Sequence, residues 1–331
     1  MELQVKNSND KPIHALVTGV GAIIGYGIIK SLRQSGLPIY IVGMDIYEDA
    51  VGQHWCDKFI QAKYAIDPNY IDFLKNVIQD NQIDIVFFGT EQEIYRVDSA
   101  RDELAEDLSK LILNQSELLA LAKDKWKTCI FLQQHGLGKI TIPSVIVGNY
   151  EDISKQYGKT FLLKPRHSYA SKGIEIVSNA EEFDFYKQRM GDNFMAQKLV
   201  GDLQHEYTVG IFGLGDGSYS GKISMRRQLS QEGATAKAWV IEDPLLDDTV
   251  DQLCQVFCPL GPTNLQFRLD AGQYLLLEIN PRISSSTSLR MAFGYNEALL
   301  SIEYFLNKKI IVPKVYTGRA ARFIDEVVII Q

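Results

Sequence analysis

Two neighbouring stretches near the carboxyl end of the chain carry side-chain oxygens at strand spacing. Gln266 lies in the apolar stretch 264–269, and Glu278 and Asn280 lie at the end of the next apolar stretch. Residues two apart point to the same face of a strand, and the turn at 270–273 places the two strands side by side. Amide and carboxylate oxygens are hard ligands that suit Mg²⁺. A metal site bridging nucleotide phosphates is therefore one interpretation of these three residues.

Glu278 stands inside an apolar run, where an unpaired carboxylate is costly to bury. It therefore requires a cation. A salt bridge to Arg268 or Arg282 meets this requirement as well as a metal ion does. Strand geometry alone leaves both interpretations open.

Lys164 ends a third apolar run and precedes a loop of small and charged residues at 165–173. A lysine ammonium at a strand end can hold phosphate, with loop amides as further donors. A solvated hairpin tip explains the same residues. The P-loop pattern G-x-x-x-x-G-K-[ST] does not occur in this segment, which excludes an ordinary P-loop NTPase.

A glycine-rich loop, Gly19 to Gly27, follows the first apolar run and precedes a helical pattern. Asp45 lies about 20 residues further on, where a ribose hydroxyl is bound in the dinucleotide-binding fingerprint. Glycines are also needed wherever a helix packs closely against a strand. The loop thus has two interpretations, a cofactor site and a structural turn.

Composition limits the classes of protein to be considered. The chain has 331 residues, enough for about two domains, with 46% hydrophobic and 23% charged residues. Its formal net charge is −7, so no basic excess points to nucleic acid. Apolar runs are shorter than the ~20 residues of a membrane span, and the first residues lack the apolar core of a signal peptide. We expect a cytoplasmic protein that binds neither nucleic acid nor membrane.

The elements that must position these residues follow from periodicity. The first hundred residues alternate strand and helix patterns, which predicts an α/β domain with a parallel sheet. A long helix is expected at 116–135, followed from residue 144 by short strands of an α+β region with a mostly antiparallel sheet.

Five motifs in this order resemble the ATP-grasp superfamily, particularly the ATP-binding half of the carbamoyl-phosphate synthase large subunit and related carboxylate-amine ligases. They are Asp124-Lys125, Leu163-Lys164-Pro165 with its loop, 196–201, Glu206-Tyr207-Thr208-Val209, and the pair of segments 264–267 and 277–282. The resemblance implies a Rossmann-like pre-ATP-grasp domain at 1–115, an ATP-grasp lid subdomain at 116–200 and a core subdomain with the metal site at 201–331.

The resemblance also assigns roles in binding ATP. Lys125 and Lys164 would hold the phosphates, and Lys172 belongs to the loop 166–173 that would cover them. Gln197, Lys198 and Leu199 would form the hinge that meets the adenine edge. Glu206 is similar to the acid that binds ribose.

Gln266, Glu278 and Asn280 match the metal ligands of the family, and Arg282 matches the arginine that faces the acyl phosphate. Arg226 and Arg227 resemble arginines that meet a substrate carboxylate or the γ-phosphate.

Two features depart from the usual pattern of the family. Most members have Asp where this chain has Gln266, and the loss of one negative charge should weaken metal binding. The loop at 166–173 has fewer glycines than usual, with His167, Tyr169 and Lys172 in their place.

The function implied by the resemblance is an ADP-forming, ATP- and Mg²⁺-dependent ligase that joins a carboxylate to an amine through an acyl phosphate. Its partners would be small-molecule substrates, and a homodimer is one expectation, since ATP-grasp ligases are often homodimers. Two alternatives remain: an NAD(P)-dependent oxidoreductase that uses the loop from Gly19 to Gly27, and a non-catalytic ATP-binding module.

Overall fold

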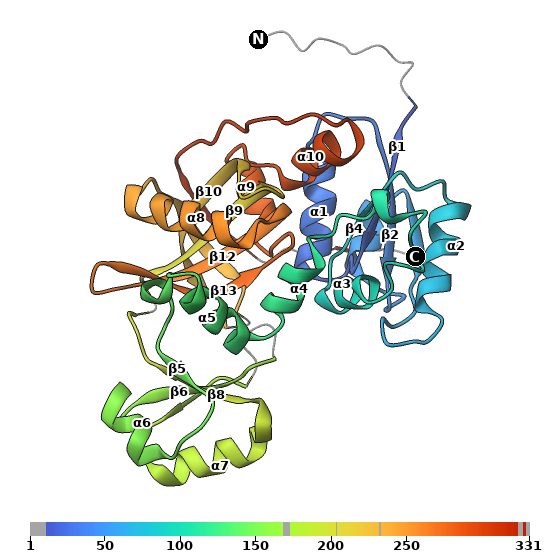
Figure 1. Ribbon diagram of the computed structural model, residues 1–331. Helices are drawn as coiled ribbons and strands as arrows, with labels where there is room; N and C mark the ends of the chain where they lie inside the picture. Colours follow the sequence, from blue (N-terminus) through green and yellow to red (C-terminus); the bar gives the residue numbers. More distant parts are fainter. Residues whose placement is uncertain (1–10, 168–172, 203, 232, 324–326, 329–331) are drawn as a thin grey trace. The chain divides into compact units, whose positions relative to one another are not determined.

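The computed structural model describes residues 11–167, 173–202, 204–231, 233–323 and 327–328 (Figure 1). The chain divides into two compact units. Unit 1 comprises residues 1–113, 285–313 and 325–331, and unit 2 comprises 114–284 and 314–324. The first boundary lies close to the predicted one at residue 115. The segment 285–313 was expected in the core subdomain at 201–331, whereas in the structure it packs with unit 1.

Unit 1 is built on a parallel sheet with the strand order β3-β2-β1-β4. This confirms the parallel sheet predicted from alternating strand and helix patterns. Its strands are β1 (Ile13–Thr18), β2 (Ile39–Asp45), β3 (Lys58–Gln61) and β4 (Ile85–Phe87). Its helices are α1 (Ile23–Arg33), α2 (Tyr70–Asp80), α3 (Glu91–Asp98), α9 (Thr287–Ala292) and α10 (Glu297–Ser301), with 3₁₀ turns η1 (Val51–Trp55) and η2 (Leu108–Lys110) and the π-helical turn η5 (Ile302–Leu306).

The late segment joins unit 1 because it packs on α1. A side chain at Gly27 would come within 2.9 Å of Thr287 Cγ2, so the glycine permits close contact between α1 and α9. Asn296 donates its side-chain amide to the Ser31 carbonyl at 2.9 Å. Arg290 and Glu297 form a fully buried ion pair between α9 and α10.

Unit 2 contains a six-stranded antiparallel sheet with the order β13-β12-β9-β10-β11-β14. Its strands are β9 (Glu206–Leu214), β10 (Tyr219–Leu229), β11 (Thr235–Val240), β12 (Leu260–Asp270), β13 (Gln273–Asn280) and β14 (Arg319–Ala321). Helix α8 (Pro244–Phe257) packs its buried residues, such as Leu246 and Leu253, against apolar side chains on one face of this sheet. The opposite face carries the polar residues of the motifs.

A second antiparallel sheet of unit 2 has the order β5-β8-β6-β7. It comprises β5 (Ser144–Val145), β6 (Phe161–Pro165), β7 (Glu175–Val177) and β8 (Phe194–Lys198), with helices α6 (Tyr150–Tyr157) and α7 (Ala180–Met190) and 3₁₀ turns η3 (Gly138–Ile140) and η4 (Gly191–Asn193). Phe161, Phe183 and Phe194 form the centre of its small core. The predicted α+β region with antiparallel strands is confirmed by these two sheets.

The predicted long helix at 116–135 is wrong in one respect. It is two helices, α4 (Ser116–Ala122) and α5 (Lys125–Gln134), with a break at Asp124. The Asp124 carboxylate accepts from the backbone N–H groups of Trp126 and Lys127, which is an N-cap that starts a new helix. The break places Lys125 in the first turn of α5.

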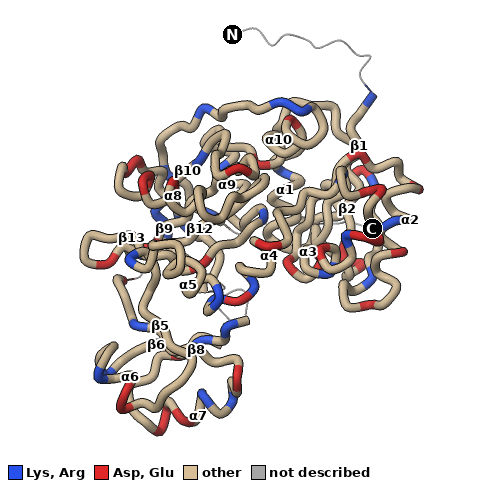
Figure 2. The backbone as a smooth tube through the Cα atoms, in the orientation of Figure 1, with Lys and Arg blue, Asp and Glu red and all other residues tan. Residues whose placement is uncertain are grey.

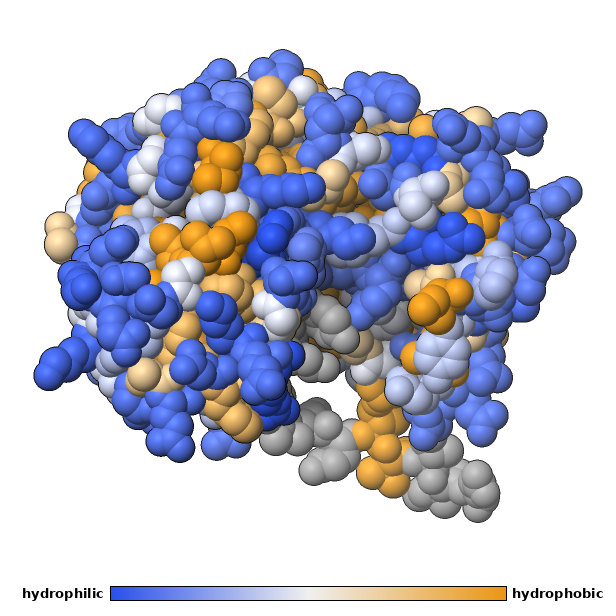
Figure 3. Space-filling model, turned by 60° about the horizontal axis from the view of Figure 1, so that its bottom comes forward, coloured by the Kyte–Doolittle hydropathy of each residue, from blue (hydrophilic) through white to orange (hydrophobic). Residues whose placement is uncertain are grey.

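Charges of both signs are distributed over both units (Figure 2), in keeping with the small net charge. On the face shown in Figure 3, hydrophilic side chains predominate and hydrophobic ones lie in separate patches. In the part of the chain that the structure describes, no helix has both the length and the apolar character required to cross a bilayer.

The turn between β1 and α1 should not tolerate a side chain at Gly25. A Cβ there would lie 2.1 Å from the Gly19 carbonyl oxygen, and this neighbour is backbone that cannot rotate away. We expect Gly25→Ala to lower the free energy of unfolding by about 3 kcal/mol in chemical denaturation. Gly138→Ala is the control, since the nearest atom to its Cβ is 3.6 Å away. Equal stability of the two variants would contradict this account of the turn.

Candidate active site

The three predicted metal ligands lie on one face of the β12–β13 hairpin. Gln266 is paired with Glu278 across the two strands, and Asn264 with Asn280. Cross-strand partners share a face, so the structure brings the side chains of Gln266, Glu278 and Asn280 together. The Asn280 amide donates to Glu278 Oε1 at 3.0 Å.

The two arginines of the salt-bridge interpretation of Glu278 make contacts with other groups. Arg268 pairs with Glu206 instead, at 2.8 Å. Arg282 donates to the Asn280 side-chain oxygen at 3.3 Å and to the Ile283 carbonyl at 3.2 Å. Glu278 and Asn280 thus present their oxygens beside a guanidinium group.

The strand pairing of the same hairpin has an irregularity beside Glu278. The pairing register shifts after Gln266, and Leu277 is the additional residue on β13. A bulge of this kind places two consecutive residues opposite one partner. Leu277 and Glu278 both line a pocket in unit 2, together with Leu276 and Ile279.

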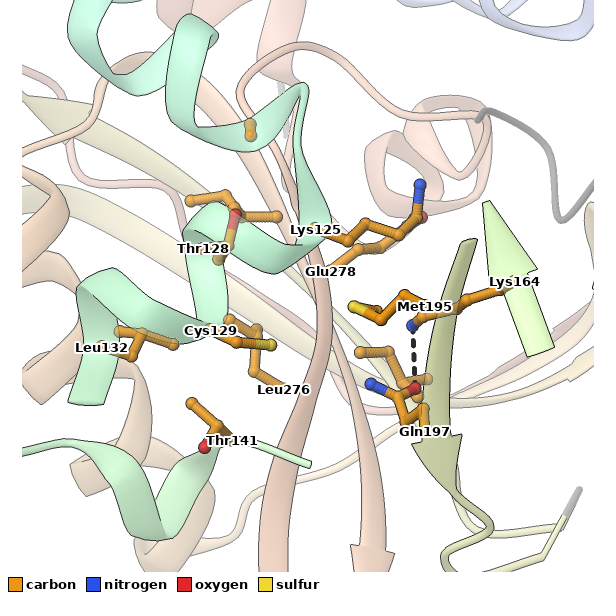
Figure 4. Close-up of a pocket in the computed structure, with 13 residues that line it drawn as sticks. Lys125, Thr128, Cys129, Leu132, Thr141, Lys164, Met195, Gln197, Leu276 and Glu278 are labelled. Atoms are coloured by element: carbon orange, nitrogen blue, oxygen red, sulfur yellow. Dashed lines mark hydrogen bonds between the residues drawn. The ribbon is translucent and has the colours of Figure 1, made fainter. Parts of the chain in front are cut away.

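This pocket also contains two predicted phosphate-binding lysines and the first hinge residue (Figure 4). Lys125 comes from α5, Lys164 from β6 and Gln197 from β8. The remaining lining is mostly apolar or weakly polar: Ala122, Thr128, Cys129, Leu132, Thr141, Met195, Leu276 and Ile279. Lys125 and Glu278 lie at one end, and Leu132 and Leu276 lie away from them.

Lys164 is held in place by a short polar chain. Its ammonium donates to Gln197 Oε1 at 2.8 Å, and the Gln197 amide donates to the Ser144 hydroxyl at 2.9 Å. Burial lowers the pKa of Lys164 to about 8, and Lys125 acts in the same direction while Cys129 and Glu278 oppose it. An anion that enters the pocket would stabilise the charged form of Lys164, which burial disfavours.

Asp124 connects the two lysine segments. Its carboxylate accepts from Arg166 Nη2 at 2.5 Å, and the Lys125 N–H donates to the Arg166 carbonyl at 3.2 Å. Burial would raise the pKa of Asp124, but the hydrogen bonds from Arg166 and from the Lys127 N–H and the nearby positive charges together outweigh it, and the net shift is downward. Arg166 was not singled out from the sequence, although its position two residues after Lys164 was the available signal.

Arg226 and Arg227, which are adjacent in sequence, have different partners, and only Arg227 contacts Glu206. Arg227 and Glu206 are cross-strand partners on β10 and β9, and their side chains form a buried ion pair at 2.7 Å. Arg227 also donates to Gln266 Oε1 at 2.7 Å, which places it beside the predicted metal ligands. Arg226 points to the opposite face of β10, because consecutive strand residues alternate, and its guanidinium stacks on Trp239 at 4.9 Å. The structure therefore does not bring Arg226 and Arg227 together.

The remaining predicted site residues lie at the margin of the described pocket. The Lys198 N–H donates to the Pro143 carbonyl at 2.9 Å, and its neighbour Leu199 is 40% exposed. Neither contributes to the pocket lining, which on β8 includes Met195 and Gln197. Lys172 lies outside the described residues.

In unit 1, the glycine-rich loop from Gly19 to Gly27 is hydrogen-bonded to Asp45, the acidic residue of the dinucleotide-binding pattern. Asp45 accepts from the Gly21 N–H at 2.8 Å and from the Tyr47 N–H at 3.0 Å. A bound pyrophosphate would need loop donors of this kind, and Gly21 already uses its N–H within the protein. This geometry favours the structural interpretation of the loop.

Comparisons with known proteins identify the fold. A family model described as "ATP-grasp in the biosynthetic pathway with Ter operon" matches residues 196–326. The structure is similar to biotin carboxylase from Campylobacter jejuni in a β,γ-ATP complex, with a TM-score of 0.71, 15% identity and coverage of 93% of this chain and 74% of that one. The chain has the ATP-grasp fold.

Other ATP-grasp proteins match over similar lengths. N5-carboxyaminoimidazole synthetase from Staphylococcus aureus, complexed with ADP, has a TM-score of 0.68 and 17% identity, with 88% of this chain and 76% of that one covered. L-amino acid ligase from Bacillus licheniformis has a TM-score of 0.66 and 14% identity, with 90% and 74% covered.

In sequence, the carbamoyl phosphate synthase large chain of Lachnoclostridium phytofermentans is 23% identical over 354 aligned residues, covering 95% of this chain. This chain spans about a third of the length of that relative, 32%. The predicted resemblance to the ATP-grasp superfamily is confirmed.

The buried Lys164 should make the stability of the protein depend on pH. The unfolded chain keeps the lysine proton up to about pH 10.5, whereas the folded protein releases it near 8. Between these values the unfolded state binds more protons, so stability rises with pH. We expect the free energy of unfolding of wild type, minus that of Lys164→Met, to rise from pH 8 by up to about 1.4 kcal/mol per unit.

Chemical unfolding of both proteins from pH 7 to 10 measures this difference. Thiols with raised pKa, such as Cys56 and Cys254, act in the opposite direction, but both proteins carry them and their effect cancels. Lys159→Met, at an exposed position, is the control. A difference that stays flat across this range would show that Lys164 is not desolvated in the folded protein.

Proposed function

We propose that this chain is an ATP-dependent ligase that joins a carboxylate to an amine through an acyl phosphate. The observation that carries the proposal is the convergence of Lys125 and Lys164 with Glu278 in one pocket, beside Gln266 and Asn280. Two buried or half-buried cations beside a row of oxygen ligands suit a polyphosphate bound together with a divalent cation.

The pocket offers separate places for the base and the phosphates of ATP. Its apolar end, with Leu132 and Leu276, suits an adenine ring, and its charged end, with Lys125, suits phosphate. Lys198 and Leu199 stand at the end of β8, where their backbone would meet the edge of the base. Since the Lys198 N–H is bonded to the Pro143 carbonyl, the Lys198 carbonyl is the group that we assign to the adenine amino group.

Gln266, Glu278 and Asn280 fit a magnesium ion by the chemistry of their donors. All three bring oxygen atoms to one face of the hairpin, and hard oxygen donors are what Mg²⁺ prefers. When bound, Mg²⁺ neutralises phosphate charge and orients the terminal phosphate. With only one carboxylate in the set, the nucleotide phosphates would supply most of the negative charge around the ion.

The charge of this face matches such a ligand. The basic side chains are Lys125, Lys164, Arg227, Arg268 and Arg282, and the acidic ones are Glu206 and Glu278. The excess of three positive charges is large for a chain with a net charge of −7. An anion is therefore the ligand that this face favours electrostatically.

The reaction needs positioning and charge neutralisation rather than a nucleophilic side chain. A carboxylate oxygen of the substrate attacks the γ-phosphorus of ATP, and ADP leaves. The amine then attacks the carbonyl carbon of the acyl phosphate, inorganic phosphate leaves, and the amine gives up a proton. Arg282 and Arg227 stand beside the oxygen ligands, where they can neutralise charge on the transferred phosphoryl group.

Two alternatives predict different ligands. An oxidoreductase would bind NADH at the loop from Gly19 to Gly27, although Asp45 occupies the Gly21 N–H there. A non-catalytic module would bind ATP without turning it over. The oxidoreductase would not require Glu278.

ADP release from Mg²⁺-ATP, measured against pools of carboxylic acids and amines, tests the proposal. We expect wild type to form ADP only when an acid is present. Glu278→Gln should lower this rate by about 100-fold, because it removes the single carboxylate of the metal set. Glu151→Gln on the exposed part of α6 is the control. Binding of NADH without ATP would overturn the proposal, and ATP binding without turnover in any pool would favour the non-catalytic module.

The neighbouring arginines of β10 give a matched pair of variants. We expect Arg227→Met to lower kcat by about 100-fold, since it removes a guanidinium group beside the metal ligands. Arg226→Met lies on the opposite face and should leave kcat close to wild type, while the lost stacking on Trp239 lowers stability by about 1 kcal/mol. Equal losses of kcat in steady-state assays of ADP formation would contradict the assignment of faces.

A further inference from the structure

Glu206 lies at the centre of a row of three charged residues on adjacent strands. In the sheet register it pairs with Arg227 on β10 and with Arg268 on β12. Glu206 Oε1 accepts from Arg227 Nε at 3.1 Å and from Arg227 Nη2 at 2.7 Å, and Oε2 accepts from Arg268 Nη2 at 2.8 Å. The side chain of Glu206 is only 6% exposed.

This arrangement leaves little capacity to bind a ribose. A carboxylate has about four acceptor positions, and three of them are occupied by guanidinium N–H groups. Two ribose hydroxyls would need two free positions. They would also have to displace charge-assisted hydrogen bonds, which are about twice as strong as bonds from neutral donors.

The same contacts fix the direction of Arg227. Arg227 donates to Glu206 through both Nε and Nη2. Its Nη2 also donates to Gln266 Oε1 at 2.7 Å. A guanidinium is a rigid fork, so the two bonds on one edge determine where the rest of the group points. Glu206 thereby sets the position of a cation at the oxygen-ligand row without touching that row itself.

We propose that Glu206 is a positioning residue that directs Arg227 toward Gln266, and that it does not bind the ribose hydroxyls. This inference rests on the proposed nucleotide site. It assigns to the row Arg227–Glu206–Arg268 the task of presenting positive charge to the terminal phosphate, while the ribose is left to other groups.

Binding measurements with ADP, 2′-deoxyADP and 3′-deoxyADP test the ribose part. In Glu206→Gln we expect the ratio of each deoxy Kd to the ADP Kd to stay within twofold of its wild-type value. If Glu206 accepts the hydroxyls, these ratios fall toward 1 in the variant, and the proposal is overturned.

A non-hydrolysable ATP analogue tests the positioning part. Glu206→Gln should weaken the analogue about tenfold more than it weakens ADP, and this extra loss should disappear when Arg227 is already Met. An extra loss that persists in the double variant would contradict coupling through Arg227.

Two further measurements keep the inference separate from the proposed function. Exchange of the Arg227 Nε–H, followed by NMR in the free protein, should be slow in wild type and at least tenfold faster in Glu206→Gln. If wild type binds no adenine nucleotide, the proposed function fails, and this exchange still decides whether Glu206 holds Arg227.

Should Glu206→Gln fail to fold, the wild-type protein with and without ADP tests the ribose part by NMR. In the same experiment on wild type with Arg268 intact, bound ADP should leave the exchange of the Arg227 Nε–H slow under our proposal, and make it at least tenfold faster if ribose hydroxyls displace Arg227 from Glu206.

Discussion

The pairing register of β9, β10, β12 and β13 is the constraint on which the rest of the site depends. In an antiparallel sheet, directly opposed residues share a face, and every other residue of a strand returns to that face. Gln266 opposite Glu278, and Arg227 opposite Glu206, are products of this register. A shift by one residue would move all of them into the apolar layer under α8 and move residues such as Phe267 out of it.

The buried apolar layer therefore fixes the polar face indirectly. Val209, Leu265 and Ile279 pack beneath α8, and their alternation leaves the intervening residues of β9, β12 and β13 to point the other way. The polar face in turn stays in place because its charges satisfy one another. Glu206 between two arginines, and Lys164 on Gln197, are pairings that make burial of these groups tolerable.

Much of the arrangement of the candidate site could be predicted from the sequence, because it depends on patterns between residues that are close in the chain. The two-residue spacing of Glu278 and Asn280, the turn at 270–273 and the apolar runs around them predict a hairpin with oxygen-bearing side chains on one face. The register confirms the hairpin and the shared face. The order of five motifs led to the ATP-grasp superfamily. The break at Asp124 was missed because the apolar pattern continues through it, and only the N-cap reveals the start of a new helix.

The sequence by itself determined the strand-by-strand alternation, the oxygen-bearing side chains of the hairpin and the family resemblance, since these depend on residue type and short spacing. Only the tertiary structure decided which charges meet. Arg226 and Arg227 are adjacent in sequence and lie on opposite faces, and Glu206 meets Arg268 from a strand 62 residues away. The physical reason is that an ion pair depends on distance in space, which strand order and register set and which sequence spacing does not encode.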